Sequence, residues 1–157
     1  MDAFVQPLYE LADFDAIIRQ LKKPGIVQVS GCLDSQKAHF TNGLLREFPF
    51  RLIVAENDLK AKAFYEDFRL YDPEVLYYPA RDLIFYQADV SGGDLVRERM
   101  RVLRALLEKR PVTIVTTMSA LMMPQTPLSG IVSRILHFDK KSTVDERKLS
   151  AQLVEMG

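Results

Sequence analysis

Short apolar runs alternate with amphipathic stretches through the first 121 residues, and this alternation restricts the fold more than any other feature. Four runs rich in β-branched side chains predict buried strands at residues 26–30, 52–55, 75–78 and 112–116. Strands that are apolar on both faces are typical of a parallel sheet covered by helices on both sides. The sequence therefore predicts an α/β domain with a doubly wound, mainly parallel sheet and right-handed crossovers.

The amphipathic stretches predict helices over residues 13–22, 35–48, 57–70 and 93–110. In the last of these, Asp94 lies near the start and Lys109 and Arg110 near the end, where the helix dipole favours charges of these signs. The apolar side chains expected to face the core are Phe14, Ile17, Ile18 and Leu21, then Leu59, Ala63, Phe64 and Phe68, then Val96, Met100, Leu103 and Leu107.

The pattern changes after Leu121. Pro124, Pro127 and Gly130 indicate a turn-rich joint, and residues 131–138 form a further candidate strand. Thr143 and Glu146 then have the spacing of a capping box, which predicts a helix continuing almost to Gly157. We therefore divide the chain into residues 1–121 and residues 122–157, and expect the second part to be the beginning of a truncated subdomain.

Charge and cysteine content exclude several classes of protein. The 21 basic and 21 acidic residues balance, whereas a domain that binds DNA mainly through phosphates usually carries a basic excess. A single cysteine, Cys32, forms no internal disulfide, which fits a reducing compartment. No apolar run approaches the ~20 residues of a membrane span, and the acidic N-terminus is unlike a signal peptide. We expect a cytoplasmic protein.

The stretch VQVSGCLDSQKAHF, residues 27–40, has the layout of a phosphate-binding P-loop, G-x-x-x-x-G-K-[ST]. Gly31 and Lys37 keep the required separation. Gln36, however, replaces the glycine that lets backbone N–H groups approach phosphate, and Ala38 replaces the hydroxyl residue that ligates Mg²⁺. Two interpretations remain: a P-loop that has lost its function, or an ordinary helix start capped by Asp34 or Ser35.

The order of four stretches adds a family resemblance. VLYYPARDLIFYQ, GGDLVRERMRVLRALLEKR, PVTIVTTMSALMMPQTP and KSTVDERKLSAQLVEMG together resemble the N-terminal module of the bacterial transcription-repair coupling factor, Mfd. That module is in turn similar to the first domains of the excision-repair protein UvrB. The resemblance implies a RecA-like, P-loop-type subdomain (UvrB domain 1a-like) up to about Leu121, followed by the start of an inserted α+β subdomain.

The resemblance also bears on the P-loop. In UvrB this loop is intact and binds ATP, whereas in the Mfd module it is typically degenerate, and ATP and Mg²⁺ act in a motor further along the chain. Gln36 and Ala38 fit the Mfd pattern, with Gly31 and Lys37 as remnants. UvrB also has a long aromatic hairpin after the third strand, and the roughly fourteen residues between Tyr78 and Gly93 are too few for it.

The function implied is that of a non-catalytic module without a cofactor, which recruits UvrA so that nucleotide excision repair follows removal of RNA polymerase stalled at a DNA lesion. The subdomain that begins near Ile131 is expected to carry much of the UvrA contact, while RNA polymerase and DNA are contacted by other domains of the parent protein. The alternative is a UvrB-like ATPase half-site of a helicase-type repair enzyme, which needs a missing C-terminal half.

Other candidate sites lie outside the loop. Arg97, Arg101 and Arg104 form a basic strip that either contacts DNA or an acidic partner, or is a solvated helix face with Arg104 paired to Glu108. Phe85 and Tyr86, in the loop that precedes this helix, are candidates for base stacking or partner binding. Two further possibilities are unsupported: His39 and His137 are too far apart to indicate a metal site, and Cys32 has no evident catalytic base.

Overall fold

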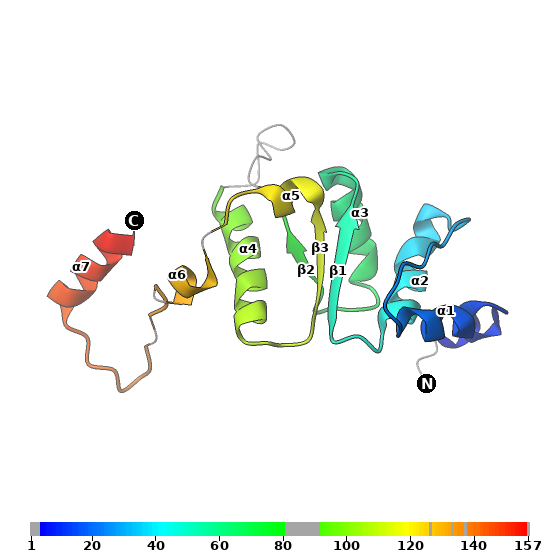
Figure 1. Cartoon of the computed structure of the whole chain (residues 1–157). Coiled ribbons are helices and arrows are strands. Elements are labelled where there is room, and N and C mark those ends of the chain that lie inside the picture. The colour runs from blue at the N-terminus through cyan, green and yellow to red at the C-terminus, as the bar shows by residue number, and fades with distance from the viewer. Residues whose placement is uncertain (1–3, 81–91, 126, 133, 137, 157) are drawn as a thin grey trace. The chain divides into compact units, whose positions relative to one another are not determined.

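The computed structural model describes residues 4–80, 92–125, 127–132, 134–136 and 138–156. It divides into two compact units, residues 1–123 and residues 124–157, which we describe separately. The first unit contains a three-stranded parallel sheet and the helices that cover it (Figure 1). Within the described residues, no helix combines the length and apolar character needed to cross a bilayer.

The sheet consists of β1 (Phe50–Ala55), β2 (Leu76–Tyr78) and β3 (Val112–Thr117), in the order β1-β3-β2. Both pairings are parallel, and β3 is the central strand, buried along its whole length. Both faces of a central parallel strand are covered, so its side chains must be apolar or must have their polar groups hydrogen-bonded. The sequence VTIVTT of β3 consists of side chains of these kinds. The prediction of an α/β fold with a parallel sheet is confirmed.

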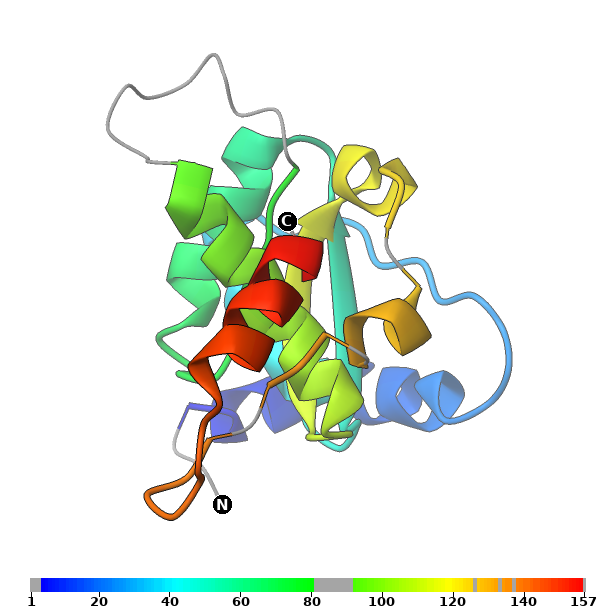
Figure 2. The ribbon, with the colours of Figure 1, turned by 90° about the vertical axis from the view of Figure 1, so that its left-hand side faces the viewer.

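Helices cover the two faces of the sheet (Figures 1 and 2). On one face, α3 (Asp58–Phe68) packs through Ala61 and Phe68 against Val115. On the other, α4 (Gly92–Leu107) packs through Val102 and Ala105 against β2 and β3, and the short α5 (Met118–Met122) joins the same cluster through Ala120. The alternation of strand and helix along the chain thus produces two cores on opposite sides of one sheet.

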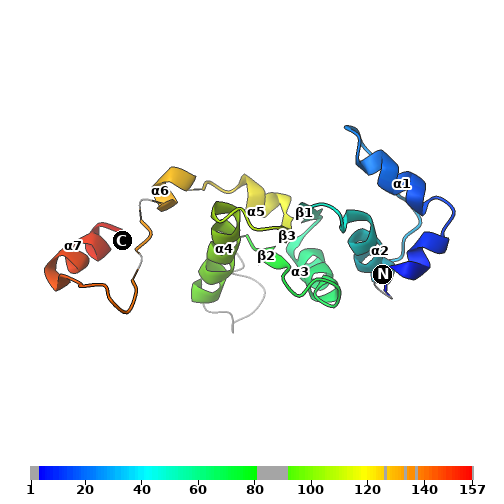
Figure 3. The same cartoon turned by 90° about the horizontal axis from the view of Figure 1, so that it is seen from below.

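The N-terminal elements form a third core. The 3-10 helix η1 (Gln6–Glu10), α1 (Phe14–Leu21) and α2 (Asp34–Leu45) meet around four buried side chains, Val5, Leu8, Phe14 and Leu44. The predicted stripe of α1 is confirmed, since Phe14 is buried and Ile17, Ile18 and Leu21 pack partly against this cluster. Figure 3 shows α1 and α2 together, with α2 beside α3, and these two helices are in contact.

The predicted strand at residues 26–30 is wrong. Residues 26–33 have no regular secondary structure, and Ile26 is 94% exposed. An apolar run becomes a strand only when a neighbour takes up its backbone hydrogen bonds, and no described strand pairs with it. The helix that follows, α2, nevertheless forms at the predicted place, because it packs against α3 and α1.

Two predicted helix faces are partly wrong. In α4, the side chains on the sheet are Arg99, Val102 and Ala105, while Val96 and Met100 are 61% and 46% exposed. In α3, Phe68 is buried as expected, whereas Leu59 is 76% exposed. Both helices have apolar residues around more than half of their circumference, so periodicity alone does not determine which side touches the sheet. In α4 the buried Arg99 and the exposed Met100 are neighbours in the sequence and about 100° apart around the helix axis.

The second unit contains two short helices, α6 (Leu128–Val132) and α7 (Glu146–Met156). The predicted strand at 131–138 is wrong, because its first residues end α6 and the others that the structure describes carry no strand. The helix near the end of the chain is confirmed, but its cap differs from the prediction. Asp145 Oδ1, rather than Thr143, accepts hydrogen bonds from the N–H groups of Arg147 and Lys148 at 3.0 and 3.3 Å.

Candidate functional site

The loop predicted to resemble a P-loop ends where α2 begins. Gly31 has φ +86°, a left-handed conformation that suits glycine, and a Cβ added there would meet no other atom within 4 Å. The carbonyl of Leu33 accepts hydrogen bonds from the N–H groups of Gln36 and Lys37 at 2.9 and 3.2 Å. Gly31 therefore has a backbone conformation that favours glycine and lies in an irregular segment just before α2, where the predicted strand does not form.

Gln36 and Lys37 both bond to groups of their own loop. The Oε1 atom of Gln36 accepts a hydrogen bond from Leu33 N–H at 3.2 Å, so this side chain occupies one donor at the helix start. Lys37 Nζ donates to Asp34 Oδ1 at 2.6 Å, and this bond lowers the pKa of Asp34 below its usual value. In a working P-loop, such donors and the lysine charge face the phosphate groups. Here the side chain of Lys37 is bound by the Asp34 carboxylate of the same turn instead.

Ala38 has a packing role. Its side chain is 1% exposed and lies in the core cluster on the α3 face, with Ile53, Ala55 and Val115. A hydroxyl group on this carbon would enter an apolar environment, where an unsatisfied polar group is costly. The residue type at this position is therefore explained by the core of the first unit.

A second charged pair lies close to the first. Glu56, directly after β1, accepts a hydrogen bond from Lys60 of α3, which lowers the pKa of Glu56 and raises that of Lys60. The charge of Lys60 also lowers the pKa of Asp34, and that of Lys37 lowers the pKa of Glu56. The start of α2 and the carboxyl end of β1 therefore share one electrostatic environment, in which two cations and two carboxylates balance.

Polar side chains also meet where β3 ends. Thr117 Oγ1 donates to Asp58 Oδ1 at 3.1 Å, lies 2.8 Å from Ser119 Oγ, and accepts a hydrogen bond from Ala120 N–H at 3.3 Å. The carboxyl ends of parallel strands are the usual ligand side of an open α/β sheet. This network instead caps α5 and ties it to the start of α3. Burial, followed by the charge of Asp58, raises the pKa of nearby Tyr77 to about 12.

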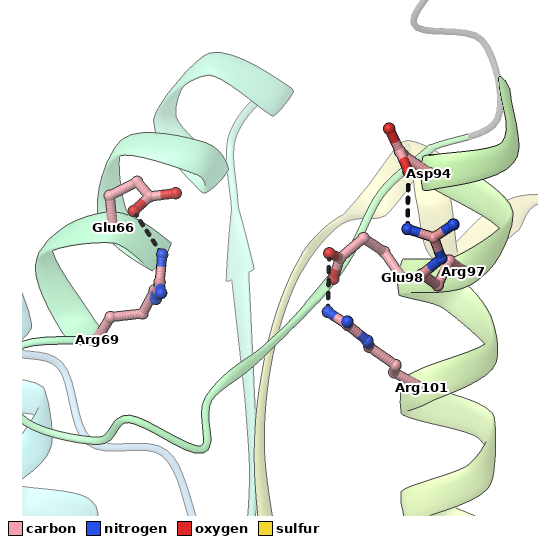
Figure 4. A network of polar contacts seen from close by, with 6 residues as sticks. All are labelled: Glu66, Arg69, Asp94, Arg97, Glu98 and Arg101. Carbon is pink, nitrogen blue, oxygen red and sulfur yellow. Dashed lines mark hydrogen bonds and ion pairs between the residues drawn. The ribbon is translucent and has the colours of Figure 1, made fainter. Parts of the chain in front are cut away.

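Each arginine of the strip on α4 pairs with an acidic residue of the same helix or of the turn directly after it. Arg97 pairs with Asp94 at 3.1 Å, Arg101 with Glu98 at 3.3 Å and Arg104 with Glu108 at 2.7 Å. Figure 4 shows the first two pairs, with Glu66 and Arg69 forming a similar pair on α3. The arrangement fits the interpretation of a solvated helix face.

Arg99, which the helical spacing places to one side of this strip, is buried at 6% exposure. It donates to the carbonyl of Pro79 at 2.5 Å and to the hydroxyl of Tyr78 at 2.6 Å. Its position one turn from Leu95 and Val102, on the side of α4 that meets the sheet, was the signal available in the sequence. Phe85 and Tyr86, the two candidate aromatic residues, lie outside the described residues.

His39 and Cys32 have no catalytic arrangement. The Nε2 atom of His39 contacts the Phe4 carbonyl, and its ring stacks on Tyr71 with 5.4 Å between centroids, so this histidine holds the N-terminal segment. Cys32 is a partly buried free thiol. Across the described residues, no group of three or more His, Cys, Asp and Glu side chains could hold a metal ion.

A pocket of about 380 Å³ lies between η1, α1 and the C-terminal half of α2. None of the candidate site residues lines it. Its walls are formed by Val5, Tyr9, Ile18, Gly43, Leu44, Arg46 and Glu47. The pocket is therefore separate from the P-loop-like turn, which lies at the opposite end of α2.

Comparison with known proteins gives one consistent result. The chain is 31% identical over 108 residues to UvrABC system protein B of Pseudomonas putida, and equally so to that of Legionella pneumophila; the match covers 68% of the chain. The protein of Pseudomonas fluorescens is 30% identical over the same length. These matches support a UvrB-like module.

The UvrB-like module is small beside these relatives. The chain spans about 15% of the length of the curated relatives it matches. No family model matches the chain, and no solved structure gives a significant match. The resemblance to UvrB expected from the sequence is therefore supported, whereas nothing in the comparison separates a coupling factor from UvrB itself.

Proposed function

We propose that this chain is a non-catalytic nucleotide-excision-repair module of the RecA-like, P-loop type, namely the N-terminal module of a transcription-repair coupling factor. Its role is to recruit UvrA to DNA where a stalled RNA polymerase has been removed. The similarity to UvrABC system protein B supports a connection with excision repair. The coupling role and the partners rest on the resemblance described from the sequence.

One observation carries the non-catalytic part of the proposal: the groups that would bind nucleotide phosphates are bonded within their own loop. Lys37 pairs with Asp34 at 2.6 Å, and the amide of Gln36 occupies a donor at the helix start. Ala38 is buried and offers no oxygen to Mg²⁺. A phosphate would have to displace a carboxylate and an amide before it could approach the loop.

Titration with a fluorescent ATP analogue in the presence of Mg²⁺ tests this proposal. We expect no saturable binding in the micromolar range, and the same result for Lys37→Ala. Micromolar, Mg²⁺-dependent binding that Lys37→Ala abolishes would contradict it. Lys62→Ala, which removes an exposed lysine of α3, is the matched control for a general loss of positive charge.

A second candidate function is a UvrB-like ATPase half-site that needs further chain to be complete. The comparisons favour it in one respect, because the relatives are named as UvrB and are much longer than this chain. The full-length gene sequence that contains this segment distinguishes the two candidate functions. A downstream motor with its own intact P-loop supports the coupling factor, whereas a single motor that this segment completes supports the ATPase.

Recruitment of UvrA is tested by a pull-down. We expect the residues from 122 onward to contribute to the contact, as the start of a second subdomain that this chain contains only in part. A longer version that completes this subdomain should therefore retain more UvrA than the 157-residue chain does. Equal retention by both would contradict this assignment of the contact surface.

A further inference from the structure

We draw no further inference here: the strongest candidate, the row of exposed apolar side chains on one face of β1 (Phe50, Leu52 and Val54), is an unpartnered surface patch, and nothing in the structure shows what covers it.

Discussion

The guanidinium of Arg99 lies over the ring of Tyr78, with 4.1 Å between its central carbon and the ring centroid, and donates to the Tyr78 hydroxyl and the Pro79 carbonyl. Arg99 belongs to α4 and Tyr78 to β2, so this contact fastens the helix to the carboxyl end of an edge strand. An arginine buried in this way has its donors directed at named acceptors, which offsets part of the desolvation of its charge.

Replacing Arg99 with methionine should destabilise the first unit. The substitution keeps the apolar stem but leaves the Pro79 carbonyl and the Tyr78 hydroxyl without a donor, and we expect a loss of about 1–3 kcal/mol in the free energy of unfolding. Urea titration measures it. Arg97→Met, on the exposed side of the same helix, should change the free energy by less than about 0.5 kcal/mol. Equal effects of the two substitutions would contradict the assignment.

Arg51 and Asp72 should be energetically coupled. Their ion pair at 3.0 Å is largely buried, and Asp72 also accepts a hydrogen bond from Thr113 at 2.7 Å, so it links β1 to β3. Arg51→Met and Asp72→Ala should each destabilise the unit, and a double-mutant cycle should give a coupling of about 1–3 kcal/mol. If the effects of the two substitutions simply add, the ion pair between Arg51 and Asp72 contributes little to the free energy of unfolding.

The pKa of Asp34 reports on Lys37. The hydrogen bond from Lys37 holds this pKa below 3.8, so Lys37→Met should raise it towards 3.8, while Lys60→Met should raise it by less. Because the pKa is lowered on folding, the small stabilisation is present above pH 3.8 and is lost as the pH falls through the folded value. Carboxyl NMR titration measures both variants. An unchanged Asp34 pKa in Lys37→Met would show that the lysine points elsewhere.

Tyr77 should ionise only at high pH. Burial raises its pKa from 10.0 to about 12, so the unfolded chain releases this proton at a lower pH than the folded chain does. Tyr77 therefore lowers stability progressively as the pH rises above 10.0 towards about 12, and has no such effect below that range. Absorbance of tyrosinate measures the ionisation, and Tyr77→Phe should remove this component. Ionisation near pH 10.0 in the folded state would contradict the burial.

The sequence predicted most elements of the first unit, because local patterns determine them. The apolar runs at β1, β2 and β3 and the amphipathic stretches at α1 to α4 were found within a few residues of their bounds. The spacing of Gly31 and Lys37 also located the start of α2 correctly. These features depend on side chains that are close in the sequence, where periodicity and capping preferences operate.

Tertiary structure decided the features that depend on distant partners. The run at 26–30 has the composition of a strand but none of the hydrogen-bond partners that a strand needs. Arg99 and Met100 are adjacent in the sequence. Helical spacing places Arg99 near Val102, but the packing of α4 on β2 and β3 decides that the arginine is buried and the methionine exposed. Sequence periodicity determines the type of an element, whereas contacts between elements determine which of its sides and edges are covered.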